Sequence, residues 1–365
     1  MIILLAIVII SYSFGVYWLS GKYLSSFKVD ITSVKFRIIR AVVAFAVAAL
    51  SSIFHIVLLV MLHLLVLFAL GEFFKVIFRK IFKKYNGAKS YVWASKIYKS
   101  GVVPVLIVAL LFTYGFFNMN TIRQTEYTVT SDKLQNSYRV VFISDTHFGT
   151  VHDAKTLQEA TENINKLNPD IVILGGDIVE EGTEKTEMAE AFETLGKINS
   201  TYGIYFVYGN HDRQRYTSVP EYSEEELADT ITKNGIMILK EDYIEIGDDI
   251  LLVGREDLSA KKDRVESNLL LNGADTDRFI LVADHQPNNV KSNTSYGADL
   301  QLSGHTHGGQ MMPLGWMPFL YSGYVYGEYK TDNTAVIVSS GFAGWGFPIR
   351  TQAVSEYVVI DICNE

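Results

Sequence analysis

Five short polar segments hold most of the residues in this chain that could carry out chemistry. They are Asp145-Thr146-His147, Gly176-Asp177, Gly209-Asn210-His211-Asp212, Asp284-His285 and Gly304-His305-Thr306-His307. Five of the eight histidines of the chain lie in these segments. Carboxylate, amide and imidazole groups are suitable ligands for Mn²⁺, Fe or Zn²⁺. Because Cys363 is the single cysteine, a cysteine-based metal site and an intrachain disulfide are both excluded.

These residues are sufficient for two metal ions that share one carboxylate. The two expected ligand sets are Asp145, His147, Asp177 and His307 for one ion, and Asp177, Asn210, His285 and His305 for the other. A shared carboxylate bridges ions about 3.5–4 Å apart in binuclear hydrolases. Such a pair activates a bridging water and binds both the attacking and the leaving oxygen of a phosphoryl group. We therefore expect two divalent ions, with manganese as the expected metal in an assay and iron or zinc as alternatives.

Apolar runs before the polar segments predict the strands that must position them. Strands are expected at 138–143, 171–174 and 203–208, with helices at 154–167 and around 188–195. Asp177 follows Asp145 by 32 residues and Asn210 follows Asp177 by 33, which is the size of one βα unit. The carboxyl ends of such strands meet at one sheet edge, where open α/β sheets have their sites. Beyond residue 235, six short apolar runs predict further strands. The sequence thus predicts an α/β fold with a second sheet from its later half.

Taken in order, the five segments resemble those of the calcineurin-like metallophosphoesterase superfamily over residues 138–361. The stretches GHTHGGQ (304–310), HQP (285–287) and GFAGWGFPIR (341–350) are similar to a membrane-associated branch that includes relatives of UDP-2,3-diacylglucosamine pyrophosphatase. The resemblance implies a sandwich of two mixed β-sheets flanked by helices, and it implies the same metal ligands. It also implies that His211 stabilises the transition state or protonates the leaving oxygen. Its neighbour Asp212 is expected to orient that imidazole.

Residues 1–118 have the composition of a membrane region. They contain 13 of the 32 Lys and Arg residues but only two of the 40 Asp and Glu residues, a net charge of +11. Four helices are expected to cross a bilayer, at about 2–19, 36–54, 56–78 and 101–118. The uncharged run 41–71 would be roughly 46 Å long as one helix, which exceeds a bilayer core of about 30 Å. Two crossings are therefore preferred over a single tilted one.

The positions of the basic residues predict the side of the membrane on which the rest of the chain lies. All 13 fall in the loops 20–40 and 75–100, which four crossings place together on the cytoplasmic side. The remaining chain would then be extracytoplasmic, whereas a single crossing of 36–78 would place it inside. We expect a linker at 119–137 and a metallophosphoesterase domain at 138–365. The net charge of −19 on residues 119–365 argues against nucleic acid as a partner.

Two residues are candidates for contact with the substrate. Arg350 closes a glycine-rich stretch and could bind a phosphate with both guanidinium nitrogens, although arginines in loops are often only solvated. Trp316 belongs to the apolar segment 311–320, which follows two expected metal ligands. This segment could form a lip for acyl chains or the bilayer surface, or it could fold back into the core.

The leading hypothesis is a membrane-anchored phosphoesterase with two metal ions that hydrolyses a phosphoester or pyrophosphate bond. Attack by a hydroxide bridging the ions is the expected reaction, and a phosphorylated, lipid-linked substrate is favoured. A nucleotide or cyclic-nucleotide phosphodiesterase is the alternative within the same chemistry. A membrane sensor or transporter with a regulatory phosphoesterase domain is the alternative of another class. The sequence does not determine the oligomeric state.

Overall fold

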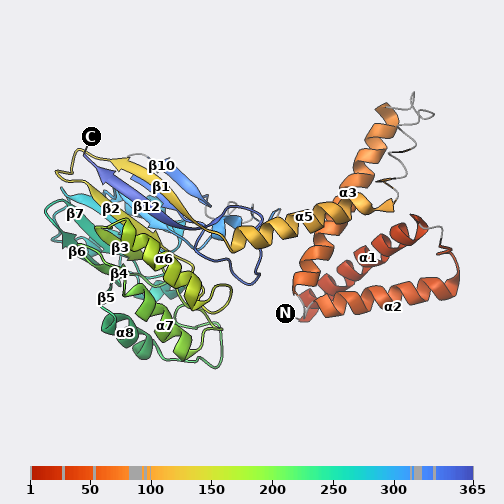
Figure 1. Cartoon of the computed structure of the whole chain (residues 1–365), viewed down its shortest axis with the longest axis horizontal. Helices are drawn as coiled ribbons and strands as arrows, with labels where there is room; N and C mark the ends of the chain where they lie inside the picture. The colour runs from red at the N-terminus through yellow and green to blue at the C-terminus, as the bar shows by residue number, and fades with distance from the viewer. Residues whose placement is uncertain are drawn as a thin grey trace. The chain divides into compact units, whose positions relative to one another are not determined.

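A computed structural model describes residues 2–26, 29–51, 55–81, 93, 97–98, 100–312, 315, 323–331 and 334–364. The chain forms two compact units, Met1–Thr113 and Tyr114–Glu365. Figure 1 shows the first unit as helices and the second as two sheets with helices beside them.

The first unit consists of apolar helices. The four long helices of the N-terminal region are α1 (Ile2–Ser26), α2 (Val34–Ser51), α3 (His55–Ile81) and α5 (Val102–Met119). Ile56–Ile77 and Val102–Met119 are long and apolar enough to cross a membrane. The uncharged run 41–71 is divided between α2 and α3, which are separate helices. How many times the chain crosses a membrane, and in which direction, stays a prediction.

The second unit contains two six-stranded mixed sheets, which confirms the expected α/β architecture. The first sheet has the order β1-β12-β2-β3-β4-β5, with strands Ile122–Thr130 (β1), Ser355–Cys363 (β12), Tyr138–Ile143 (β2), Ile171–Leu174 (β3), Ile204–Phe206 (β4) and Ile236–Ile238 (β5). The second has the order β10-β11-β9-β8-β7-β6, with strands Gly327–Thr331 (β10), Thr334–Val338 (β11), Leu300–Ser303 (β9), Phe279–Ala283 (β8), Ile250–Gly254 (β7) and Asp242–Ile246 (β6). Three longer helices are α6 (Ala154–Lys166), α7 (Lys185–Leu195) and α8 (Glu224–Lys233), and the short helices are Leu258–Asp263, Ser267–Leu270, Pro287–Asn289, Val290–Ser295 and His307–Gly309.

The central strands are buried on both faces, as their continuous apolar runs predict. In β2, Val140 and Phe142 pack into the core between the sheets, whereas Val141 and Ile143 pack beneath the helices. The residues of β3 alternate in the same way. This period of two follows from the pleat, which points successive side chains to opposite faces. The ends of these strands are therefore fixed from both sides, and so are the polar residues that follow them.

The expected linker at 119–137 is wrong for most of its length. Residues 122–130 form β1, which pairs in parallel with β12 from Ile122↔Ser355 to Thr130↔Cys363. The strand lies at the edge of its sheet, so most of its side chains meet water while Tyr127 and Val129 pack inward. An edge strand needs little apolar sequence, and for this reason its polar composition suggested a linker.

Candidate metal centre

The five polar segments converge at one end of the two sheets. Three of them follow β2, β3 and β4, which are parallel neighbours in the first sheet. The other two follow β8 and β9, which are parallel neighbours in the second sheet. The structure thus brings together residues that lie as far apart in the chain as Asp145 and His307.

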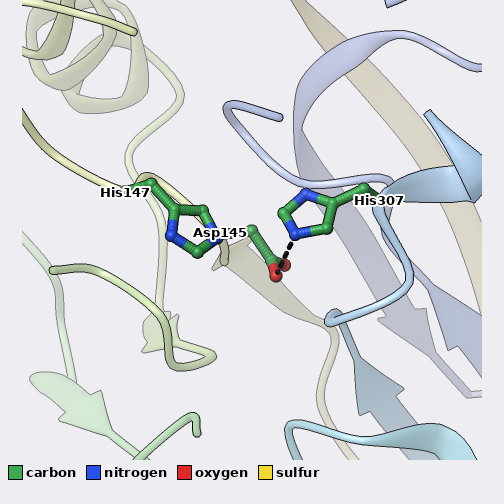
Figure 2. A group of neighbouring side chains, drawn as sticks. All are labelled: Asp145, His147 and His307. Carbon is green, nitrogen blue, oxygen red and sulfur yellow. Dashed lines mark ion pairs between the residues drawn. The ribbon is translucent and has the colours of Figure 1, made fainter. Parts of the chain in front are cut away.

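One group consists of Asp145, His147 and His307, whose ligand atoms lie within 4.8 Å of one another. Figure 2 shows the three side chains pointing toward a common space. His307 Nε2 lies 3.7 Å from Asp145 Oδ1, and the other ring nitrogen, Nδ1, is 3.1 Å from Ala343 O. Because a carbonyl can only accept, Nδ1 carries the hydrogen and the lone pair of Nε2 faces the carboxylate. A metal-binding histidine is oriented in this way.

A second group consists of Asp177, His285 and His305, again with ligand atoms within 4.8 Å of one another. His285 Nδ1 donates to Gly175 O at 2.7 Å, and Nε2 lies at hydrogen-bond distance, 3.1 Å, from Asp177 Oδ2. The rings of His285 and His305 are 5.2 Å apart and nearly perpendicular, at 73°. The second group therefore has the same composition as the first, one carboxylate and two imidazoles.

Asp177 lies between the two groups. Its Oδ2 is 3.1 Å from His285 Nε2 and 4.0 Å from His147 Nε2. Its Oδ1 accepts a hydrogen bond from the backbone N–H of His211 at 2.8 Å, which fixes the plane of the carboxylate. This arrangement fits the shared ligand that the sequence predicts.

Backbone strain is concentrated at these residues. Left-handed φ angles occur at Asp145 (54°), His147 (40°), Asp177 (51°), His305 (69°) and His307 (49°). Such angles are uncommon outside glycine and are costly unless the surrounding structure enforces them. These strained angles cluster at five expected ligands. They cost free energy of folding, and they direct the ligand side chains into the site.

Two buried polar atoms show whether a metal suits the site. Within the part of the chain that the structure describes, His147 Nε2 and Asn210 Oδ1 have no hydrogen-bond partner. A buried polar atom left without a partner costs about 1–3 kcal/mol. Coordination of a cation would satisfy both atoms, and their imidazole and amide chemistry suits Mn²⁺, Fe or Zn²⁺. The residues present therefore fit a pair of divalent ions.

The electrostatics of the groups agree with metal binding for most ligands. Burial would raise the pKa of Asp145 and of Asp177, but the nearby histidines outweigh it and both pKa values are lowered. Burial lowers the pKa of His307 to about 3, so its imidazole is neutral. Ionised carboxylates and neutral imidazoles are the forms that bind metals. His285 differs, because the charge of Asp177 outweighs burial and raises its pKa.

His211 lies at the rim of the two groups and has its own carboxylate partner. Its Nδ1 is 2.6 Å from Glu181 Oε2. Burial lowers the pKa of His211, but the hydrogen bond and charge of Glu181 and the charge of Asp177 outweigh this effect, so the pKa is raised. Tyr216 and Trp345 place their rings 5.2 Å and 5.7 Å from the imidazole. The surroundings of His211 therefore favour the protonated form of its imidazole.

Asp212 does not orient His211, contrary to the expectation. Its buried carboxylate accepts hydrogen bonds from the backbone N–H groups of Gly209 (2.6 Å), Ile178 (2.8 Å) and Asp177 (2.9 Å). Consecutive residues in this turn point in different directions, so Asp212 joins two loops while His211 faces the site. Burial, together with the charge of Asp177, raises the pKa of Asp212 to about 6.

Glu180 and Glu181 are site residues that the sequence reasoning missed. Glu180 Oε2 lies 2.9 Å from His147 Nδ1, and Glu181 Oε2 lies 2.6 Å from His211 Nδ1. They follow Asp177 by three and four residues. This pair of acidic residues, shortly after the second polar segment, was the available signal.

Arg350 does not reach the site as a phosphate ligand. It is fully buried, and its guanidinium donates to Ala343 O at 2.6 Å, to Ser340 O at 2.7 Å and to Val354 O. Arg350 therefore holds the loop 341–353 together. Trp316 lies outside the described residues, as does most of the segment 311–320; of its first two residues, Met311 is buried and Met312 is exposed.

This chain is similar to a family of known proteins, to individual relatives and to solved structures. Residues 138–309 match the family described as calcineurin-like phosphoesterase. A "transmembrane protein with metallophosphoesterase domain" of Danio rerio is 30% identical over 295 residues, which is 76% of this chain and 65% of that protein. An uncharacterized metallophosphoesterase of Helicobacter pylori J99 is 30% identical over 230 residues, which is 62% of this chain and 60% of that protein. The chain thus spans less than two thirds of the length of these two relatives. The solved structure of TT1561 of Thermus thermophilus is 13% identical, with a TM-score of 0.39, and covers 57% of this chain and 92% of that one.

Proposed function

Residues 138–309 of this chain belong to the calcineurin-like phosphoesterase family, and we propose from this that the chain is a membrane-anchored, metal-dependent phosphoesterase. The observation that carries the proposal is the position of Asp177 between two groups of metal-binding side chains. A site with two ions and a shared carboxylate is suited to transfer of a phosphoryl group to water.

Each ligand side chain in the site has a defined task in this proposal. Asp145, His147 and His307 would hold one divalent ion, Asn210, His285 and His305 the other, and Asp177 would contact both. When bound, the ions would activate the water and neutralise charge on the phosphoryl oxygens. Manganese is proposed as the metal that supports activity in an assay, with iron or zinc as alternatives.

His211 is proposed to donate the proton that the leaving oxygen needs. Glu181 accepts the hydrogen bond of Nδ1, which leaves Nε2 as the nitrogen that can face the substrate. The same carboxylate favours the protonated ring, since its charge raises the pKa of His211. A positioned proton donor suits an alcohol or phosphate leaving group.

The substrate is proposed to be associated with a membrane, such as a lipid-linked phosphoester or pyrophosphate. The catalytic unit begins at Tyr114, inside the apolar helix α5 that ends at Met119. Only residues 120 and 121 separate this helix from β1, the first strand of the catalytic unit. The last turn of a candidate membrane span thus belongs to the same compact unit as the proposed metal ligands.

The experiment is a metal-dependent hydrolysis assay on the full-length protein in lipid nanodiscs. The protein is treated with chelator, reloaded with Mn²⁺ and given bis-(p-nitrophenyl) phosphate, a soluble nucleotide diester and a phosphorylated lipid in separate reactions. We expect Mn²⁺-dependent hydrolysis that is abolished in Asp145→Asn and kept in Asp229→Asn, an exposed carboxylate on α8. Absence of metal-dependent hydrolysis with every compound would refute the enzyme. Hydrolysis of the soluble compounds but not of the lipid would refute the membrane-associated substrate.

A further inference from the structure

Two exposed aromatic rings contact the proposed proton donor. Tyr216 is 62% exposed and Trp345 is 50% exposed, although both rings contact the largely buried His211. The Trp345 ring is inclined by 33° to the imidazole and the Tyr216 ring by 57°. The two rings come from different loops, which follow β4 and β11. A molecule that reaches His211 from solvent therefore meets aromatic surface.

The position of the rings identifies the part of a substrate that would touch them. If His211 protonates the leaving oxygen, the carbon group attached to this oxygen must lie beside His211. Trp345 and Tyr216 are the aromatic rings that contact His211 there. Aromatic rings bind apolar surface and gain free energy by removing it from water. The surface beside His211, where the leaving group of the substrate would lie, is thus suited to an apolar alcohol.

The last turn of α5 holds the loop that carries Trp345. Asn118 Nδ2 donates to Ala353 O at 2.8 Å and to Arg350 O at 3.1 Å, while the N–H of Arg350 donates to Gly115 O at 3.0 Å. On the other side of Trp345, a side chain at Gly344 would collide with Met119, whose Cε lies 2.4 Å from the position of such a Cβ. The N–H of Trp345 itself donates to Gln310 Oε1 at 2.9 Å.

These contacts place Trp345 beside the end of a candidate membrane span. All of the residues involved belong to the unit Tyr114–Glu365, so the last turn of α5 is part of the catalytic unit. On the same turn, Phe116 and Phe117 are 52% and 64% exposed. Aromatic residues gather where a span leaves the hydrocarbon core. An apolar alcohol held in a bilayer at this point would lie near Trp345.

We propose that Trp345 and Tyr216 bind an apolar alcohol portion of the substrate's leaving group, and that Asn118 is a positioning residue that holds Trp345 through the loop 341–353. The proposal rests on the proposed phosphoesterase function for the place of the leaving oxygen. It goes beyond that function, because it assigns the chemistry of the leaving group and the side chains that recognise it.

A series of n-alkyl phosphates tests the two rings. Methyl, butyl and octyl phosphate have leaving alcohols of similar acidity, so differences in kcat/KM report contact with the chain rather than chemistry. In Mn²⁺-loaded full-length protein in nanodiscs, kcat/KM should rise with chain length. Trp345→Ala and Tyr216→Ala should each lower kcat/KM for octyl phosphate by about tenfold and for methyl phosphate by less than about twofold. Trp93→Ala, an exposed tryptophan of the first unit, serves as the control. Equal dependence on chain length in wild type and both variants would overturn the proposal.

The role of Asn118 is tested by comparison with Asn120. Among the residues that the structure describes, the Asn120 side chain donates to Phe116 O alone, at 2.8 Å, and is exposed. Asn118→Ala should reproduce the selective loss for octyl phosphate with metal content and turnover of methyl phosphate retained, whereas Asn120→Ala should not. The double variant with Trp345→Ala should be no worse than Trp345→Ala alone, because both changes remove the same interaction. An additive loss would refute the positioning role.

A binding measurement separates this proposal from the proposed function. Octylphosphonate and methylphosphonate resist hydrolysis, and their affinities for the metal-loaded protein are measured by calorimetry. Tighter binding of octylphosphonate that is lost in Trp345→Ala supports the aromatic site even if no ester is hydrolysed, in which case only the enzymatic function fails. The same preference in wild type and Trp345→Ala refutes the aromatic site, even if hydrolysis is efficient.

Discussion

At the scale of residues, Asp177 is the side chain on which the arrangement of two ions depends. Its Oδ2 is within 3.1 Å of one ligand group and 4.0 Å of the other. Each of the other proposed ligands belongs to one group alone. No other ligand can therefore replace Asp177 in both groups. Asp177 also accepts a hydrogen bond from the backbone N–H of His211, and it thereby connects the proposed metal ligands to the proposed proton donor.

Asp177→Asn should therefore cause the largest loss of any single ligand change. An amide oxygen is uncharged and is a poor bridge between two cations. We expect metal affinity and turnover to fall by more than about 100-fold, with both ions lost together. Metal analysis of the purified protein measures this, with Asp229→Asn as the control. Retention of the metal content and rate of the wild type would contradict the shared-ligand arrangement.

His211→Ala should leave the metal content intact while the rate falls. The rate should decrease by about 10²–10⁴-fold, the usual contribution of a positioned acid. The loss should be smaller with p-nitrophenol as the leaving group, since it departs without a proton. A rate constant for each leaving group, compared with metal content, gives the answer. An equal loss for all leaving groups would point to stabilisation of phosphoryl charge instead.

Glu181→Gln should change the pH profile in a defined direction. The carboxylate of Glu181 raises the pKa of His211, so its removal lowers that pKa. A general acid works only while protonated, and activity is lost as the pH rises through its pKa. The alkaline limb of the kcat/KM profile should therefore move to lower pH in this variant, with Glu225→Gln on α8 as the control. An unmoved limb would show that Glu181 does not act through His211.

At the scale of elements, the loop 341–353 is held by a buried arginine in addition to the apolar contacts of Phe342 with the core. The guanidinium of Arg350 binds three backbone carbonyls, and one of them belongs to Ala343, whose oxygen also receives Nδ1 of His307. The arginine therefore acts on the first ligand group through the loop. Its burial lowers the pKa of Arg350 to about 10, so it remains charged at neutral pH.

Arg350→Met should destabilise the catalytic unit. The change leaves three buried carbonyls without their donor, at a cost of about 2–4 kcal/mol. The melting temperature of the full-length protein in nanodiscs should fall by several degrees. The half-exposed Arg215→Met should show little change. If Arg350→Met keeps the wild-type melting temperature and instead raises KM for phosphate esters, the side chain contacts substrate.

At the scale of the whole molecule, charge is divided sharply along the chain. Residues 1–118 carry +11 and residues 119–365 carry −19. An anionic cytoplasmic leaflet attracts the first and repels the second. The proposed extracytoplasmic position of the catalytic unit follows from this division together with an even number of crossings.

Labelling of Cys363 tests this orientation. Cys363 is the single cysteine, it lies at the end of β12 and its side chain is partly exposed. A membrane-impermeant thiol reagent added to intact cells, or to spheroplasts if an outer membrane is present, should label the protein. Cys363→Ser is the control for specificity. Labelling only after the cytoplasmic membrane is broken would place the catalytic unit inside and would favour a single crossing by residues 36–78.

The sequence by itself determined the central strands, and it predicted the candidate metal ligands that the fold brings together. Asp145, Asp177 and His285 follow apolar runs, and the regular spacing of the first segments fixes their common sheet edge. These features are local, because the burial of a strand and the length of a βα unit can both be predicted from residues that are close together in the sequence. Only the tertiary structure decided that Glu181 rather than Asp212 contacts His211, that Arg350 faces backbone carbonyls, and that polar residues 122–130 complete a sheet by pairing with β12. Each of these outcomes depends on where a side chain or strand meets a partner that is distant in the chain or lies across a turn, and local pattern carries no information about that direction.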